Sequence, residues 1–293
     1  MDKTKFYAYR FFIIPYEQIS FYTNNTKPKE KLIIDFFEKL QHDPKYIFMM
    51  GDKKHIVYYN KKVREDIHIC KLAKQSFQKT PREGDRDIEE AALEVCPFVK
   101  IIVDVKKQKI LVEKKTSVFS RPGQIEKTLQ NWFNAVTIND GYEFKVEAIT
   151  DEKDFWNKVD NAQYIYSLEI KLNAPNLFGG KAKASEFIQE AKNEYNNTSV
   201  NIKLENDKGF LKLGKEKIKS FIEYATAGGG NWILRTKTSK NSPMQTTKSQ
   251  SKIRMVSIPE NIDNLEDEEV TEQLYQILED VETMMVDDDS ETC

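Results

Sequence analysis

Apolar residues alternate with polar ones, or form short runs rich in β-branched and aromatic side chains, in many stretches of the chain, and these patterns predict strands. In the first half, the predicted strands are 6–15, 46–51, 55–60, 97–104, 109–113 and 142–149. The pair 46–51 and 55–60 predicts a hairpin that turns at Asp52. In the second half, the predicted strands are 164–172, 199–204, 231–236 and 252–258.

Apolar residues that recur at helical spacing predict helices between these strands. The predicted helices are 29–41, 122–136, 151–159, 182–195 and 215–226. Gly228 is placed to end the last of them. Helices mixed with strands that have one polar face indicate an α+β fold, with two mixed, largely antiparallel sheet layers and helices packed on one face.

Three parts of the chain differ in composition and pattern. We predict an N-terminal α+β domain over 1–140, a βα-repeat domain with a basic β-hairpin over 141–259, and an acidic tail over 260–293. Residues 61–93 are charged and are not assigned to elements, and 79–85 have the composition of a loop.

Charge divides the chain unevenly, although the formal net charge is only −2. Residues 260–293 contain fourteen Asp and Glu and no Lys or Arg, so residues 1–259 hold 45 basic and 33 acidic side chains, a net charge of +12. A basic body favours a polyanionic partner. The tail also has an apolar stripe at helical spacing, which predicts an acidic tail helix docked on the body or on a partner: Val270, Leu274, Ile277, Leu278 and Val281.

The segment from Tyr224 to Pro259 contains no acidic residue, and its polar part is bracketed by two predicted strands. Lysine and arginine neutralise phosphates, while Ser, Thr, Asn and Gln add hydrogen bonds to phosphate oxygens. The predicted nucleic-acid-binding residues are Arg235, Lys237, Lys240, Lys248, Lys252 and Arg254. The alternative is a solvated loop that balances the charge of the tail.

Catalytic signals are weak in this sequence. A Mg²⁺-dependent nuclease uses an acidic residue followed by (D/E)xK on a strand, and two tripeptides have this form, one with Asp104 and Lys106 and the other with Glu169 and Lys171. The three histidines lack metal-ligand spacing, and Gly228-Gly229-Gly230 lacks the ending of a phosphate-binding loop. We therefore predict no catalytic residue, metal or cofactor, and keep the nuclease as an alternative.

The order of segments resembles the Rex exclusion protein A family of phage lambda and a broader family of bacterial phage-defence proteins. The residues that carry this resemblance are FYAYR at 6–10, TSVFSRP at 116–122 before a helix, and LEIKL at 168–172 followed by Pro175 and Phe178-Gly179. In the broader family, a strand-turn-strand-helix block precedes βα units and a polar hairpin, here 98–136, 162–226 and 231–258. The resemblance implies a cytoplasmic anti-phage component that binds DNA or a protein–DNA complex as a dimer and signals to a membrane partner.

These observations favour a non-enzymatic, sequence-independent DNA-binding sensor or adaptor of an abortive-infection system, inhibited by its own acidic tail. A second hypothesis is a nuclease effector, and a third is a protein-interaction subunit that docks through the tail helix. We expect no membrane span, because no run approaches eighteen apolar residues. Three cysteines without close pairing are typical of a reduced, cytoplasmic protein.

Overall fold

The computed structural model describes residues 2–15, 29–83, 87–137, 141–173, 183–264 and 268–283. Within them the chain forms six α-helices and fourteen strands, and the pairs between these strands are antiparallel. The predicted α+β class is therefore confirmed. None of the described helices is long and apolar enough to cross a membrane.

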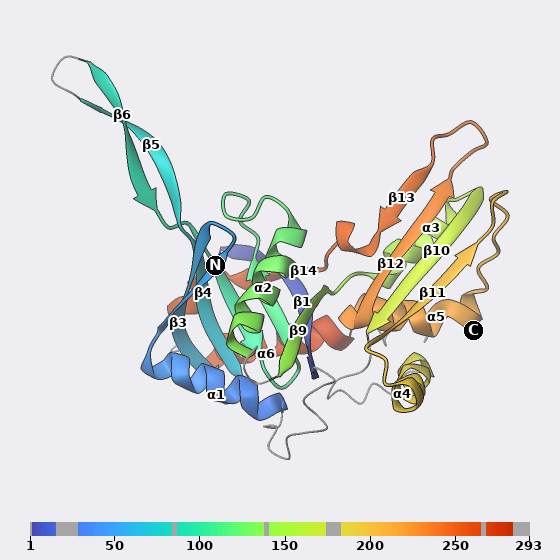
Figure 1. Cartoon of the computed structure of the whole chain (residues 1–293), viewed down its shortest axis with the longest axis horizontal. Coiled ribbons are helices and arrows are strands. Elements are labelled where there is room, and N and C mark those ends of the chain that lie inside the picture. The colour runs from blue at the N-terminus through green and yellow to red at the C-terminus, as the bar shows by residue number, and fades with distance from the viewer. Residues whose placement is uncertain are drawn as a thin grey trace.

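The larger of the sheets contains eight strands in the order β14-β1-β8-β7-β4-β3-β2, with β9 paired to β1 beside this path (Figure 1). Strand β1 pairs with β14 and β8 through its first part and with β9 through its second part. The strands are β1 (Lys3–Pro15), β2 (Lys45–Met50), β3 (Lys53–Arg64), β4 (Ile67–Lys74), β7 (Phe98–Asp104), β8 (Lys109–Glu113), β9 (Tyr142–Ala148) and β14 (Met255–Pro259). The predicted hairpin at Asp52 is confirmed as β2 and β3.

Helices cover both faces of this sheet. On one face, α1 (Lys29–His42) and α2 (Pro122–Thr137) pack over an aromatic cluster in which the rings of Phe133 and Phe144 stack with centroids 4.1 Å apart. On the other face lies the predicted tail helix, α6 (Glu268–Thr283), with Leu274, Leu278 and Val281 buried. Because both faces are covered, β7 and β8 are nearly continuous apolar runs rather than alternating ones.

The second sheet has four strands in the order β11-β10-β12-β13 (Figure 1). They are β10 (Tyr164–Asn173), β11 (Ser199–Glu205), β12 (Gly230–Lys237) and β13 (Gln245–Lys248). One face packs against α3 (Glu152–Asp160), α4 (Lys183–Tyr195) and α5 (Lys215–Tyr224), which bury Phe155, Ile188 and Ile222 against it. The opposite face carries no helix in the described part of the chain, and its strands present Lys171, Lys203 and Arg235 to solvent.

A glycine turn joins α5 to β12 where the two sheets meet. The helix ends in a π-helical turn, η2 (Ala225–Gly229), in which Gly228 has φ +85°, a left-handed conformation that favours glycine. A Cβ on Gly228 would lie 2.7 Å from Cβ of Arg10 in β1. The glycine predicted to end the helix therefore also permits close approach of the two sheets.

The sheets do not follow the predicted domain boundaries. Strands β9 and β14, assigned to the second domain, both pair with β1 in the larger sheet. Residues 142–148 and 255–259 thus tie the second part of the chain to the first. Independent folding of 1–140 and 141–259 stays a prediction.

A two-stranded arm, formed by β5 (Ser76–Glu83) and β6 (Ile88–Val95), projects from the larger sheet between β4 and β7 (Figure 1). The loop predicted over 79–85 is wrong for residues 79–83, which lie in β5, and 84–86 fall outside the described residues. Pro81 is tolerated there because β5 pairs on one side only and a free edge does not require every N–H.

Candidate nucleic-acid interface

The basic segment forms a β-hairpin at the end of the second sheet, with β12 and β13 joined by residues 238–244 (Figure 1). The strand predicted at 252–258 is not part of this hairpin, because β14 pairs with β1, and β13 was not predicted. In its register Arg235 pairs with Thr246 and Ile233 pairs with Lys248. Directly paired residues share a face, so Arg235 and Lys248 lie on the sheet face opposite the helices. Trp232 and Leu234 alternate with them and are buried on the helix side.

Four of the predicted phosphate-binding cations are presented by this hairpin. Arg235, Lys240 and Lys248 are exposed, and within the residues that the structure describes none of them forms an ion pair. Lys237 is half-buried, with its Nζ 6.0 Å from the centroid of the Tyr166 ring. These side chains are therefore available to an anionic partner.

The other two predicted residues are held by the protein itself. Lys252 Nζ lies 2.6 Å from Oδ1 of Asp154 in α3, and Arg254 Nη1 donates to the Val281 carbonyl of α6 at 3.2 Å. The strand predicted over 252–258 begins only at Met255, because residues 249–251 form a 3₁₀ turn, η3 (Ser249–Ser251), that directs Lys252 toward α3.

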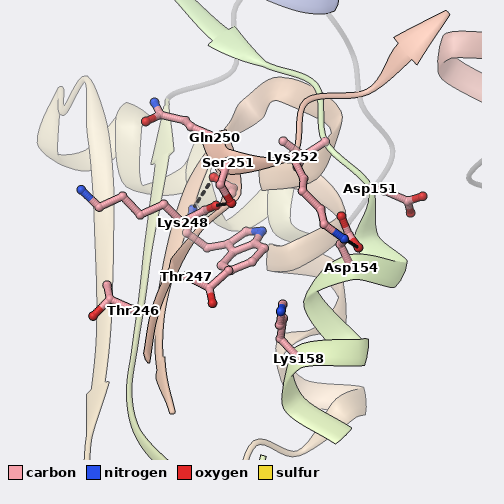
Figure 2. A pocket seen from close by; sticks show the side chains of 12 residues that line it. Asp151, Asp154, Lys158, Thr246, Thr247, Lys248, Gln250, Ser251 and Lys252 are labelled. Carbon is pink, nitrogen blue, oxygen red and sulfur yellow. Dashed lines mark hydrogen bonds and ion pairs between the residues drawn. The ribbon is translucent and has the colours of Figure 1, made fainter. Parts of the chain in front are cut away.

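A pocket of about 590 Å³ lies between the hairpin and α3 (Figure 2). Figure 2 shows Lys158 and Lys252 on its inner side, whereas Lys248 extends away from α3. Trp232 and Thr150 are among the residues that line the pocket, and their buried Nε1 and Oγ1 atoms have no hydrogen-bond partner among the described residues. Sequence reasoning missed this pocket because the end of α3 precedes the start of the hairpin by about seventy residues and Lys158 carries no motif.

The two nuclease tripeptides lie in different surroundings. Asp104 is fully buried, its Oδ1 accepts from the Lys107 backbone N–H at 2.8 Å, and burial raises its pKa to about 6, while Lys106 is exposed. Glu169 lies on the open face of the second sheet, where it accepts from Asn201 at 3.1 Å. In the described part of the chain, no three His, Cys, Asp or Glu side chains are grouped as metal ligands. Each of the two acids thus takes part in a local hydrogen bond.

A buried polar network connects the two sheets beneath the hairpin. Glu147 of β9 accepts from Asn173 at 3.1 Å and from Asn231 at 3.3 Å, and Glu126 of α2 accepts from Gln250 at 3.3 Å. Both carboxyl groups are more than nine-tenths buried. Because Gln250 also lines the pocket, the network joins α2 to the site. The network could not be predicted from the sequence, since its five residues come from distant segments.

The protonation of Glu126 should make stability depend on pH. Burial and the nearby Glu147 raise its pKa from 4.5 to about 7. The raised pKa means that stability is fully present below about pH 4.5 and is lost as the pH rises toward 7, by about 3 kcal/mol. We expect Glu126→Gln, which keeps the bond to Gln250, to be more stable than the wild type at about pH 8 and no more stable at about pH 4.5 in urea unfolding. An equal pH dependence of the two proteins would contradict this.

Comparison with known proteins adds no relative: no protein-family model and no curated protein matches the chain. The residues and their geometry therefore carry the functional argument.

Proposed function

We propose that the protein is a non-enzymatic, sequence-independent DNA-binding sensor or adaptor of an anti-phage system, and that its β12–β13 hairpin contacts phosphates. The observation that carries this proposal is the group of exposed cations on the hairpin, Arg235, Lys240 and Lys248, without ion-pair partners among the described residues. Elsewhere on the surface, several lysines are already paired, such as Lys203 with Glu205 at 2.8 Å and Lys215 with Asp160 at 3.2 Å.

The hairpin suits a phosphate backbone rather than base edges. Its length places cations along one extended edge of the sheet, and the residues between them are Ser, Thr, Asn and Gln, which donate to phosphate oxygens. Lysines and arginines that bind phosphates release counterions, and this contribution does not depend on sequence. We therefore expect affinity for random duplex with strong dependence on salt.

In this proposal Lys252 would contact a phosphate only after its ion pair with Asp154 opens. Its exposed side chain is paired with Asp154, which is partly buried beside the pocket. A phosphate that approaches η3 would compete with Asp154 for the same ammonium group. Exchange of one anion for another costs little, because exposed ion pairs contribute about 0–1 kcal/mol.

The acidic tail is proposed to compete with DNA through its last residues. The described part of the tail comprises residues 260–264 and α6. The apolar stripe of α6 is buried in the body, and the Val281 carbonyl near its end accepts from Arg254. Residues 287–291 contain Asp287, Asp288, Asp289 and Glu291. These acids follow the end of α6 closely in sequence, and α6 ends beside Arg254.

The place in phage defence follows from the resemblance to the Rex exclusion family, which also supports a dimer and a membrane-bound partner. The rival hypothesis of docking through the apolar face of α6 loses support, because Leu274 and Leu278 are buried in the larger sheet. A partner would instead meet the outer side of α6, which includes exposed Asp280.

Fluorescence anisotropy with a labelled random duplex tests the proposal. We expect the full chain to bind at about 50 mM salt and to bind much more weakly at about 200 mM. A chain ending at residue 286 should bind roughly tenfold more tightly at the lower salt, because four negative charges are removed. Equal affinity of the two chains would contradict competition by the tail, and absence of binding by both would contradict the proposal as a whole.

A further inference from the structure

The arm formed by β5 and β6 has no covering element in the described structure. Its strands are eight residues each, about 27 Å long, and they pair only with each other. Both strands are exposed along most of their length, on both faces. An isolated two-stranded hairpin is at best marginally stable in water. The arm therefore requires an additional surface to become firmly ordered.

The arm combines apolar and acidic side chains. Phe77 is 70% exposed, Ile88 is 72% exposed and Leu93 is 43% exposed. Residues 76–95 contain six acidic and three basic side chains, a net charge of −3, whereas the rest of residues 1–259 carries +15. The register places Phe77 and Ile88 on one face of the arm and Leu93 on the other. Large exposed apolar residues on an uncovered element indicate a binding surface. Its acidity disfavours nucleic acid and favours a basic protein surface.

A matching surface lies on strands β2 and β3, on the face opposite α1. Ile47, Met49 and Tyr58 are 46%, 58% and 40% exposed there. The register pairs Lys45 with Tyr58 and Met49 with Lys54, so both lysines lie among these apolar residues. The apolar cluster beneath α6 includes no described residue of β2, so the tail helix leaves this end of the face uncovered.

We infer that the arm of one molecule docks on the β2–β3 surface of a second copy, and that the second copy returns the same contact. Figure 1 shows the arm directed away from its own larger sheet, so it does not reach this surface within one chain. The base of the arm is fixed beside the same surface, since the backbone N–H of Gln75 donates to the Lys54 carbonyl at 3.0 Å. The arm and the β2–β3 surface, which would receive the arm of the second copy, thus lie next to each other in one molecule. This placement suits a twofold dimer in which both contacts are the same. The proposed function includes a dimer without an interface; the contact inferred here is argued from the arm and the β2–β3 surface alone.

Sedimentation velocity over a concentration series tests the inference with the full chain and two arm variants. In the first variant Asn-Gly replaces residues 75–96. Ala73 and Phe98 are paired and the Lys74 N–H donates to the Pro97 carbonyl, so a two-residue turn can close β4 onto β7 without disturbing the sheet. The second combines Phe77→Ser, Ile88→Ser and Leu93→Ser. Matched controls are Phe187→Ser and Met244→Ser, which are 46% and 45% exposed on other elements.

We expect the full chain and the controls to dimerise, and both arm variants to raise the dimer dissociation constant at least about 30-fold. Ile47→Ser with Met49→Ser should have the same effect. Mixing the Ile47→Ser, Met49→Ser variant with the chain that lacks the arm should restore a heterodimer. In that mixture the intact arm of the first chain can dock on the intact β2–β3 surface of the second. A monomeric full chain, or an armless chain that dimerises normally, would overturn the inference. Loss of duplex binding by an armless chain that still dimerises would assign the arm to nucleic acid instead and would also overturn it.

Discussion

A chain truncated after residue 264 is expected to lose cooperative folding. The truncation removes α6, whose Leu274, Leu278 and Val281 are almost fully buried against β1, β4, β7 and β8. Burial of each such side chain contributes about 1.5–3 kcal/mol, so loss of three equals most of the stability of a typical domain. Removal of α6 would also expose to water the apolar side chains of Ile69, Ile102 and Leu111 on this face of the sheet.

Electrostatic contacts add to this effect. Lys109 is fully buried, and its Nζ donates to the Leu278 carbonyl of α6 at 2.7 Å. Lys107 Nζ lies 3.2 Å from Glu279. Cations near the last turn of a helix are stabilised by its carbonyl groups. Without α6, Lys109 would lose that carbonyl and part of its charge compensation.

The single variant Leu278→Ala provides a graded measurement. It should lower the free energy of unfolding by about 2–5 kcal/mol, because a fully buried leucine is replaced and a cavity remains. Urea unfolding followed by circular dichroism measures the change. A chain ending at residue 286 retains α6 and should unfold at the same urea concentration as the wild type. An unchanged midpoint for Leu278→Ala, or folding of the 264 truncation, would show that α6 is a loosely attached tail.

The largest effect on binding is expected from removal of the exposed hairpin cations. The triple variant Arg235→Gln, Lys240→Gln and Lys248→Gln should weaken duplex binding at about 50 mM salt by at least about 100-fold, since three phosphate contacts and their counterion release are lost. Its stability should change by less than about 0.5 kcal/mol, because these side chains are exposed and form no ion pairs among the described residues.

The matched control is Lys31→Gln, Lys62→Gln and Lys127→Gln, three exposed lysines on α1, β3 and α2. It changes the net charge by the same amount at sites away from the hairpin. We expect at most a few-fold loss of affinity from this general reduction in charge. Equal weakening by both triple variants would show that binding depends on net charge rather than on the hairpin.

Most elements of the fold could be predicted from the sequence, because helical spacing and alternation are local signals. The stripe of Leu274, Leu278 and Val281 predicted α6, and Gly228 correctly marked the end of a helix. The arm could not be predicted. Its strands are charged, carry Pro81 and bury no face, so they lack the periodicity from which a strand is recognised.

The candidate site could be predicted only in part. A segment without acidic residues pointed to a basic hairpin, and its first strand formed as expected as β12. The second strand was wrong, because β12 pairs with the unpredicted β13, whereas the strand predicted at 252–258 pairs with β1 as β14. Its partners depend on tertiary packing: Asp154 pairs with Lys252 and Val281 contacts Arg254, although both come from distant parts of the chain. Buried Glu126 and Glu147 were missed for the same reason, since an isolated glutamate is normally a surface residue.

The most direct measurement is the slope of log binding constant against log salt concentration for the wild-type chain and the Arg235, Lys240 and Lys248 triple variant on one random duplex. Each phosphate contact contributes about −0.9 to this slope. We expect the variant slope to be shallower than that of the wild type by about 2.7, with the Lys31, Lys62 and Lys127 variant close to the wild type. Binding that does not weaken with salt, or identical slopes for wild type and hairpin variant, would contradict phosphate contact through the hairpin.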